Sequence, residues 1–508
     1  MEKHANALVA HYLRSHGYTN TLSAFEQELG VRFNPNKPLD NDESLDAILA
    51  DRINYLESNN SSNAVDYKDE DEVNKLDTIV HSELIKSKKI ELPHWSITIP
   101  NVHQTLNLGT LSALIISSSY FNAIINDKAY NLAIFLTNTR YLFIIDLDTN
   151  QIVLSKFDVF GNGQQIKTVI GIHGTSHIVL CDMNGNIAST SLLPDNSSDT
   201  LQFILSLVTS PLKLHRRLIT DFKFLSFNDA LNPKLIGYFA SIGWDSRITV
   251  GRVLQNIDDE NSIDFEIIGD YKLFTNPTCL LILQDTKTNL PIVIVGRLDS
   301  SLLTLFTITS HNDSKLVELA KLSLNDSEFS SHSFQPMAIT EISNVSSLNN
   351  DKIITVGTDH IPYMRLITLV VPSIHEIIKP EDDKEEILFS ELTKLYEYNK
   401  ENTESFQSNT QILRSYIFSN FNSLSPQDKY SNAILLSRPN CSGVWIPGDD
   451  GKLRGFDLRS GTVFETLDSN DGRAKSAFIG RYGLNSQFEV MAVCGAVDKK
   501  ISIWKCNT

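Results

Sequence analysis

The sequence predicts a mainly β fold that is built from a repeated unit and preceded by a small all-α segment. Residues 1–57 carry apolar side chains at helical spacing, and residues 58–90 are acidic and rich in Ser and Asn. From residue 91 onward, strand-like apolar runs alternate with polar turns. The chain has 508 residues and is 41% hydrophobic, which is ample for a large buried core.

Residues 1–57 are predicted to form three short amphipathic helices. Leu8 and Tyr12 lie four residues apart, so they share one face of the first helix. Gly17 then suits the left-handed conformation that often ends a helix, and a third apolar stripe follows within residues 40–57. Helical domains this short bury too little apolar surface to be stable alone. Self-association is therefore expected, with a small monomeric helical domain as the alternative.

The first two of these helices resemble the LisH motif, a helical pair named after the lissencephaly protein. The resemblance covers residues 4–36 and rests on Leu8, Tyr12, Leu13, Gly17, Tyr18, Thr21, Phe25 and Glu28. In that family the helical pair dimerises, so the resemblance implies a homodimer. The dimer interface is expected to consist of Leu8, Tyr12, Leu13, Tyr18, Thr21, Phe25 and Leu29.

Residues 58–90 are predicted to be a solvated linker, because acidic and polar residues outnumber apolar ones. The most acidic run, at 66–72, is expected to be spacer, with binding of a basic partner as the alternative. Residues 79–90 are a candidate for one further helix.

Residues 91–508 repeat one unit, which consists of an apolar strand, a tight turn carrying Asp or Asn, and a second strand. The turn residues of the seven copies are Asn138, Asn184, Asp245, Asp299, Asp359, Asp450 and Asp498. Their side chains can bond backbone amides within the turn, so a structural role is predicted for them. The units resemble WD repeats, the blades of a WD40-type β-propeller. The resemblance implies a ring of seven or eight blades.

Two further segments are predicted from their position. The apolar alternation of residues 94–100 suits the outer strand of the last blade, which would latch the ring closed. The largest gap between turn residues, from Asp359 to Asp450, holds a partly helical insertion near 378–432. The predicted helix there has an apolar stripe of Leu388, Leu392 and Leu395. We expect it to pack on the side of the propeller, with a docking element for a partner as the alternative.

Composition and motifs argue against several classes of function. The formal net charge of −17 disfavours a nucleic-acid binder, because phosphate contacts need a basic surface. The five cysteines are scattered, which disfavours a disulfide framework or a zinc site and favours a reducing compartment. No phosphate-binding loop or hydrolase motif occurs, so we assign no catalytic residue, metal or cofactor. The most basic short stretch, at 214–218, is expected on a surface strand or loop, with partner contact as a minority alternative.

The sequence also lacks a signal peptide and an apolar run long enough to span a membrane. An intracellular protein of the nucleus and/or cytoplasm is therefore expected. The resemblance to LisH and WD40 proteins implies a non-catalytic scaffold that homodimerises through its helices and binds protein partners through its propeller. Such proteins serve in multiprotein regulatory complexes, of which ubiquitin ligases and transcriptional corepressors are the leading cases. The alternatives are a structural propeller subunit of a large assembly and, less favoured, a small-ligand-binding or enzymatic propeller.

Overall fold

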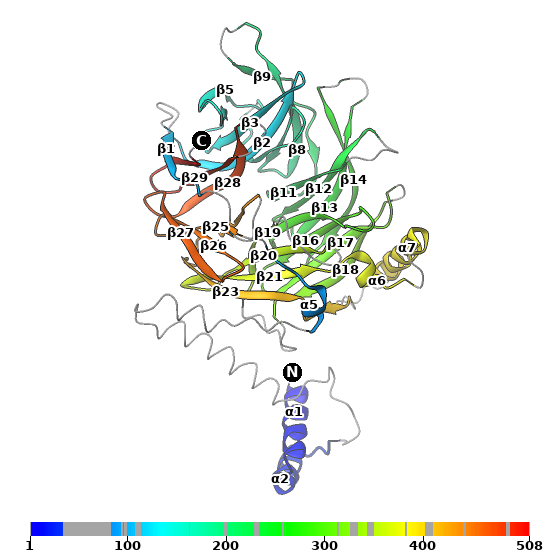
Figure 1. Ribbon diagram of the computed structural model, residues 1–508. Helices are drawn as coiled ribbons and strands as arrows, with labels where there is room; N and C mark the ends of the chain where they lie inside the picture. Colours follow the sequence, from blue (N-terminus) through cyan, green and yellow to red (C-terminus); the bar gives the residue numbers. More distant parts are fainter. Residues whose placement is uncertain are drawn as a thin grey trace. The chain divides into compact units, whose positions relative to one another are not determined.

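The computed structural model divides the chain into two compact units, and the helical residues 2–33 lie in the first while every described strand lies in the second (Figure 1). The described residues are 2–33, 83–92, 95, 99–106, 113–161, 163–197, 201–227, 233–256, 259, 261–311, 314–325, 334–342, 350–380, 384–401, 410–439, 443–483 and 488–506.

The first unit contains a helical hairpin made of α1 (Glu2–Ser15) and α2 (Thr19–Leu29). Gly17 lies between the helices with φ of +74°, and Gly30 caps α2 with φ of +64°. Both glycines adopt the left-handed conformation that L-residues with a side chain avoid, which explains why the helices end where they do. The third helix predicted within 40–57 lies outside the described residues.

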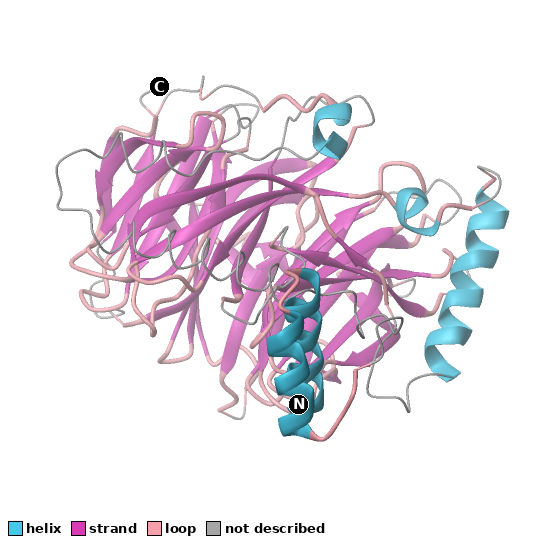
Figure 2. Cartoon of the chain, turned by 90° about the horizontal axis from the view of Figure 1, so that it is seen from below, coloured by secondary structure: helices cyan, strands magenta, loops and turns pink. Residues whose placement is uncertain are grey.

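The described strands of the second unit form seven sheets, so this unit is a seven-bladed β-propeller. Figure 2 shows that strands make up nearly all of it and that helices lie at its periphery. Blades 1 to 3 are, in chain order, blade 1 with β2 (Ile115–Ile125), β3 (Lys128–Thr137), β4 (Tyr141–Asp146) and β5 (Gln151–Phe157); blade 2 with β6 (Ile166–Gly171), β7 (His177–Asp182), β8 (Asn186–Pro194) and β10 (Leu212–Lys213), and with β9 (Phe203–Leu205) beside β8; and blade 3 with β11 (Ile219–Ser226), β12 (Leu235–Gly243), β13 (Arg247–Gln255) and β14 (Ile263–Lys272). Blades 4 and 5 are blade 4 with β15 (Pro277–Gln284), β16 (Pro291–Arg297), β17 (Leu302–Ile308) and β18 (Leu316–Ser323), and blade 5 with β19 (Pro336–Ile342), β20 (Lys352–Thr358), β21 (Tyr363–Val371) and β23 (Ile417–Pro426). Blades 6 and 7 are blade 6 with β24 (Leu436–Ser437), β25 (Gly443–Pro447), β26 (Lys452–Asp457) and β27 (Thr462–Asp468), and blade 7 with β28 (Ala474–Tyr482), β29 (Phe488–Gly495), β30 (Ile501–Lys505) and β1 (Val102–Leu106).

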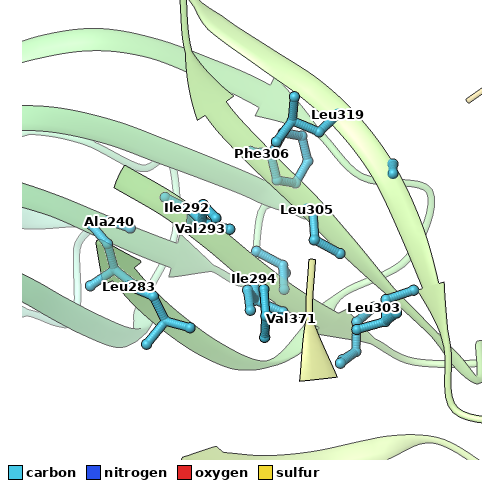
Figure 3. Packing of buried hydrophobic residues seen from close by; sticks show 14 of the residues in the cluster. Ala240, Leu283, Ile292, Val293, Ile294, Leu303, Leu305, Phe306, Leu319 and Val371 are labelled. Carbon is cyan, nitrogen blue, oxygen red and sulfur yellow. The ribbon is translucent and has the colours of Figure 1, made fainter. Parts of the chain in front are cut away.

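Burial falls from the middle strands to the outer strand in most blades, although β18 of blade 4 is also buried. The second and third strands are buried along nearly their whole length, as in β16 and β17, because neighbouring blades cover both faces. These strands therefore read as continuous apolar runs. Outer strands such as β27 alternate between half-buried and exposed residues. In Figure 3, side chains including those of Ile294, Leu305 and Val371 fill the core between neighbouring sheets.

The ring is closed by β1, which pairs antiparallel with β30 so that Val102 faces Lys505 and Leu106 faces Ile501. The expectation that residues 94–100 form this strand is wrong by several residues. Four of the five residues of β1 are exposed, so this strand needs no apolar alternation and gave no signal in the sequence.

Trp95, from the segment that we expected to close the ring, is instead buried in the core beside blade 6. Its ring meets that of Trp445 edge-on at a centroid distance of 5.6 Å. Glycine at 443 and 455 leaves the space for it, since a Cβ at Gly443 would lie 2.1 Å from the Trp95 ring. The guanidinium of Arg438 lies 4.2 Å from the centroid of the ring.

The insertion between β21 and β23 contains α6 (Ile374–Ile378), α7 (Glu385–Glu401) and β22 (Ile412–Leu413). Leu388 and Leu392 of α7 are fully buried against the propeller core, as expected for a helix packed on its side. The predicted insertion near 378–432 is too long, because β23 lies within it and is the outer strand of blade 5. The polar sequence of β23 concealed this strand.

A further helix, α5 (Glu83–Lys88), lies in the segment that was predicted to be a linker up to residue 90. Ile85 and Leu92 are buried with apolar residues of blades 5 and 6. The Nζ atom of Lys88 donates hydrogen bonds to Asp351 and Glu376 at 2.7 and 2.8 Å. Residues 83–92 are therefore an integral part of the propeller, and residues 58–82 lie outside the described residues.

Candidate interaction sites

The helical hairpin of the first unit leaves nearly all of its described apolar side chains half-buried or exposed. None of the residues of α2 is buried within the chain. Tyr18 is 51% exposed and Leu29 is 36% exposed, whereas Tyr12, Leu13 and Phe25 are half-buried. Thr21 is exposed, and the side chain of Leu8 lies outside the described part of the chain. An apolar surface of this kind is typical of a helical pair that packs against a partner.

Aromatic rings extend this surface beyond the residues expected from the sequence. The rings of Tyr12 and His16 stack at a centroid distance of 4.4 Å, and those of His16 and Tyr18 at 6.2 Å. Phe33 stacks on Phe25 at 6.4 Å. Sequence reasoning missed His16 and Phe33, because both lie beyond the ends of α1 and α2.

A polar clasp joins the C-terminal end of α1 to α2 and to the residues that follow α2. The backbone amide of Phe33 donates to Oε1 of Glu26 at 3.1 Å, and Nη2 of Arg14 donates to the carbonyl of Phe33 at 3.0 Å. Arg14 also lies 3.7 Å from Glu26. The clasp fixes the angle of the hairpin and therefore the shape of its exposed face.

The side chains of three predicted turn residues bind the segment that precedes the first strand of the same blade. The carboxylate of Asp245 accepts a hydrogen bond from the backbone amide of Arg216 at 2.8 Å. Asp359 accepts in the same way from the amide of Gln335 at 2.9 Å, and Asp498 from that of Asp471 at 3.1 Å. These bonds join the ends of different strands, so the turn aspartates fix the loops on this edge of the ring.

The other predicted turn residues behave differently. Asp450 accepts from the amide of Lys452 within its own turn and pairs with Arg454, while its neighbour Asp449 accepts from the amide of Asp428 at 3.2 Å. Among the described contacts, no side-chain hydrogen bond is formed by Asn138, Asn184 or Asp299.

In the turn of Asn184, the buried carboxylate of Asp182 accepts the hydrogen bonds of the turn amides instead. It accepts from the amides of Asn184 and Asn186 at 2.8 and 2.7 Å. Asp450 thus bonds a backbone amide within its turn as predicted, whereas in the Asn184 turn this role belongs to Asp182, two positions earlier.

His215 is the main residue of the blade turns that the sequence reasoning missed. Its Nδ1 atom lies 3.0 Å from Oδ1 of Asp245, and its Nε2 atom lies 2.9 Å from the hydroxyl of Ser241. Burial lowers the pKa of His215, and hydrogen bonding to Asp245 opposes this only in part. The neutral ring then donates from Nδ1 to the carboxylate and accepts from Ser241 at Nε2. The stretch 214–218 is thus only partly a surface loop, since Arg216 and Arg217 are exposed while His215 is buried.

The described residues offer little for catalysis. Burial raises the pKa of the Cys279 and Cys494 thiols to about 12, so neither is a nucleophile at neutral pH. No group of His, Cys, Asp and Glu within the described ranges has the geometry to hold a metal ion. A cavity lined by Asp285, Asp351 and Glu376 has a volume of about 10 Å³, which is room for about one water molecule.

Comparison with known proteins places the chain in a family. A family model described as the beta-propeller domain of UCP007778 matches residues 74–505, and the LisH domain of the same family matches residues 3–33. The chain belongs to the UCP007778 family. The two matches coincide with the propeller and the helical hairpin, and they include α5 in the propeller domain, as the structure does.

A relative of this UCP007778 protein is the uncharacterized protein YGR117C of Saccharomyces cerevisiae. The two are 23% identical over 485 residues, which cover 90% of this chain and 88% of the yeast protein. The similarity thus extends over both units. In the portion of the chain that the structure describes, we find no helix that is long and apolar enough to cross a membrane.

Proposed function

We propose that this UCP007778 protein is a dimeric scaffold that pairs through its LisH hairpin and presents two propellers to protein partners. The observation that carries the proposal is the lack of any buried residue in α2, in a hairpin that matches a LisH domain. A helix of 11 residues is marginal in water without tertiary packing. A second copy of the hairpin supplies that packing.

Pairing also explains why such a hairpin is joined to a propeller. Two propellers on one dimer raise the effective concentration of the second binding event for a partner that can reach both. The turn aspartates hold the loops at one edge of the ring in place, which gives each propeller a preorganised surface.

The proposal includes membership of a multiprotein regulatory complex inside the cell, in the nucleus and/or cytoplasm. Ubiquitin-ligase and corepressor assemblies, with a WD40-type propeller as the adaptor, are the two kinds to test first. Affinity purification of the intact chain and of a chain lacking residues 1–57, followed by mass spectrometry, tests this part. Partners of either kind that are lost on truncation support it, and a chain that purifies alone contradicts it.

The dimer itself is tested by light scattering on the full-length chain. Tyr18→Ala removes an exposed aromatic ring from the hairpin and is expected to raise the dimer dissociation constant at least tenfold, as for an interface hot spot. Gln27→Ala, at an exposed position of α2 outside the LisH-type residues, is the matched control and is expected to leave the dimer unchanged. A wild-type chain that is monomeric at micromolar concentration, or a Tyr18→Ala chain that dimerises as well as wild type, contradicts the proposal.

A further inference from the structure

We propose that one patch on blade 3 binds an acidic peptide segment of a protein partner, with an apolar or aromatic side chain of that segment as its anchor. The inference rests on the proposed scaffold function and assigns a site and a partner chemistry to it. The Trp244 patch, as we call it, consists of Arg216, Arg217, Trp244, Lys272, Phe274 and Arg297.

Two aromatic rings at the patch are exposed to solvent. Trp244 is 57% exposed and Phe274 is 58% exposed. Tryptophan and arginine are the residues that most often dominate the binding energy of protein interfaces. Rings of this size are normally buried, so their exposure in two connections that are joined by a backbone hydrogen bond between Leu273 and Ser246 indicates a docking surface.

Hydrogen bonds around one turn bring the patch together. The amide of Trp244 donates to the carbonyl of Leu218 at 2.9 Å, which places the ring beside the segment that carries Arg216 and Arg217. On the other side, the amide of Leu273 donates to the carbonyl of Ser246 at 2.7 Å.

The last two cations of the patch lie next to Phe274. Lys272 faces Arg247 across the β13–β14 pair. The guanidinium of Arg297 lies 5.8 Å from the centroid of the Phe274 ring, and its Nη1 atom donates to Thr275 at 3.2 Å. The ring of Phe274 is therefore held in position from one side.

Three cations of the patch are available to a ligand, whereas the half-buried Arg297 interacts with the exposed carboxylate of Asp299. In the described part of the chain, the side chains of Arg216, Arg217 and Lys272 form no ion pair. Asp245 is held by His215 and the amide of Arg216, and Asp270 pairs with Arg247. A protein with a net charge of −17 thus presents a locally basic surface here.

Exposed aromatic rings among unpaired cations fit a segment with complementary chemistry. Carboxylates of an acidic peptide would pair with the guanidinium and ammonium groups, and an apolar side chain would pack on the two rings. Single-stranded RNA also uses aromatic rings and arginines, but the strongly acidic chain repels a polyanion over distances of about 8 Å at physiological salt. We therefore infer a peptide and leave RNA as an outcome of the test.

Selection of phage-displayed random peptides on the full-length chain tests the inference. The selected peptides are expected to be acidic and to contain an aromatic or large aliphatic residue. Synthetic copies, titrated by fluorescence anisotropy, are expected to bind Trp244→Ala about tenfold more weakly than wild type, as for an interface hot spot. Lys272→Gln is expected to weaken binding several-fold, and higher salt is expected to weaken binding to wild type.

Two matched variants lie at the other ends of the strands. Ile124→Ala removes an exposed apolar side chain near the end of β2, and Lys287→Gln removes an exposed charge in the β15–β16 turn. Both are expected to bind the peptides like wild type. Peptides that are basic, or that are insensitive to Trp244→Ala, overturn the inference but leave the scaffold function standing.

Two further outcomes are decisive. If no peptide is selected, the inference is overturned, while partner binding by the propeller is still decided by the affinity purification. Tighter binding of a labelled oligouridylate than of the acidic peptides, lost in Trp244→Ala, would assign the patch to RNA and overturn the inference. Circular dichroism of each variant confirms that the fold is retained.

Discussion

The Nζ atom of Lys88 lies 2.7 Å from Oδ1 of Asp351, although Asp351 is 263 residues further along the chain. The same ammonium group lies 2.8 Å from Oε1 of Glu376. Burial lowers the pKa of Lys88, but hydrogen bonds to the two carboxylates outweigh this and raise the pKa above its ordinary value. The lysine therefore stays charged at neutral pH and anchors α5 to the propeller.

Lys88→Met is expected to lower the free energy of unfolding by about 3 kcal/mol, because it leaves two carboxylates without their cation. Urea unfolding at neutral pH measures the change. Lys89→Met, at an exposed neighbouring position, is the control and is expected to change the free energy by less than about 0.5 kcal/mol. Because the pKa of Lys88 is raised, the contribution is lost only as the pH rises through that value. Equal unfolding free energies for the two variants would show that α5 is not anchored by this lysine.

A second prediction concerns pH. Burial, aided by Arg365, lowers the pKa of His360 to about 4. The unfolded chain binds a proton at a pH near 6.5 whereas the folded chain does not, so stability is present above pH 6.5 and is lost as the pH falls toward 4. His360→Gln is expected to reduce the slope of unfolding free energy against pH by up to about 1.4 kcal/mol per pH unit in this window. An unchanged slope in chemical unfolding between these pH values would contradict the assignment.

The bond between Asp245 and His215 yields a third prediction. Asp245→Ala leaves a buried imidazole N–H and the amide of Arg216 without an acceptor, so a loss of about 2 kcal/mol is expected. Asn138→Ala is the matched control, because the side chain of Asn138 forms no hydrogen bond among the described contacts. Urea unfolding of both variants should separate them by more than about 1 kcal/mol, which is a typical net value for one hydrogen bond. Similar losses would mean that all turn residues act alike.

The fourth prediction compares two tryptophans. Trp95→Ala is expected to cost about 4 kcal/mol, because it opens a cavity between Trp445 and two glycines. Trp244→Ala removes an exposed ring and is expected to cost less than about 0.5 kcal/mol. Guanidinium unfolding followed by circular dichroism avoids the loss of fluorescence signal in either variant. A large loss in Trp244→Ala would undermine its placement on a docking surface.

Much of the fold could be predicted from the sequence, because local signals agree with it. The helical hairpin follows from the spacing of Leu8 and Tyr12 and from Gly17. Turn residues such as Asp245 and Asp498 mark the blades, and the family match confirms the combination of propeller and LisH domain.

What could not be predicted depends on contacts that are distant in the chain or that carry no apolar pattern. The exposed strand β1 has no periodicity to reveal its register. The buried pair of Arg438 and Glu489, at 2.7 Å, and the anchoring of Lys88 join residues far apart in sequence. Only its contacts with Ser241 and Asp245 distinguish His215 from a surface histidine. No short sequence motif links these three residues.

The pairing of β1 with β30 has a consequence for synthesis of the protein. Ile501 lies 395 positions after its partner Leu106 (501 minus 106). At a rate of roughly 5–20 residues per second, the ribosome needs about 20–80 s to make the intervening chain. During that time the segment of β1 has no strand to pair with, and blade 7 cannot be assembled. The nascent chain thus carries β1 as an unpaired strand until the residues of β30 have been made.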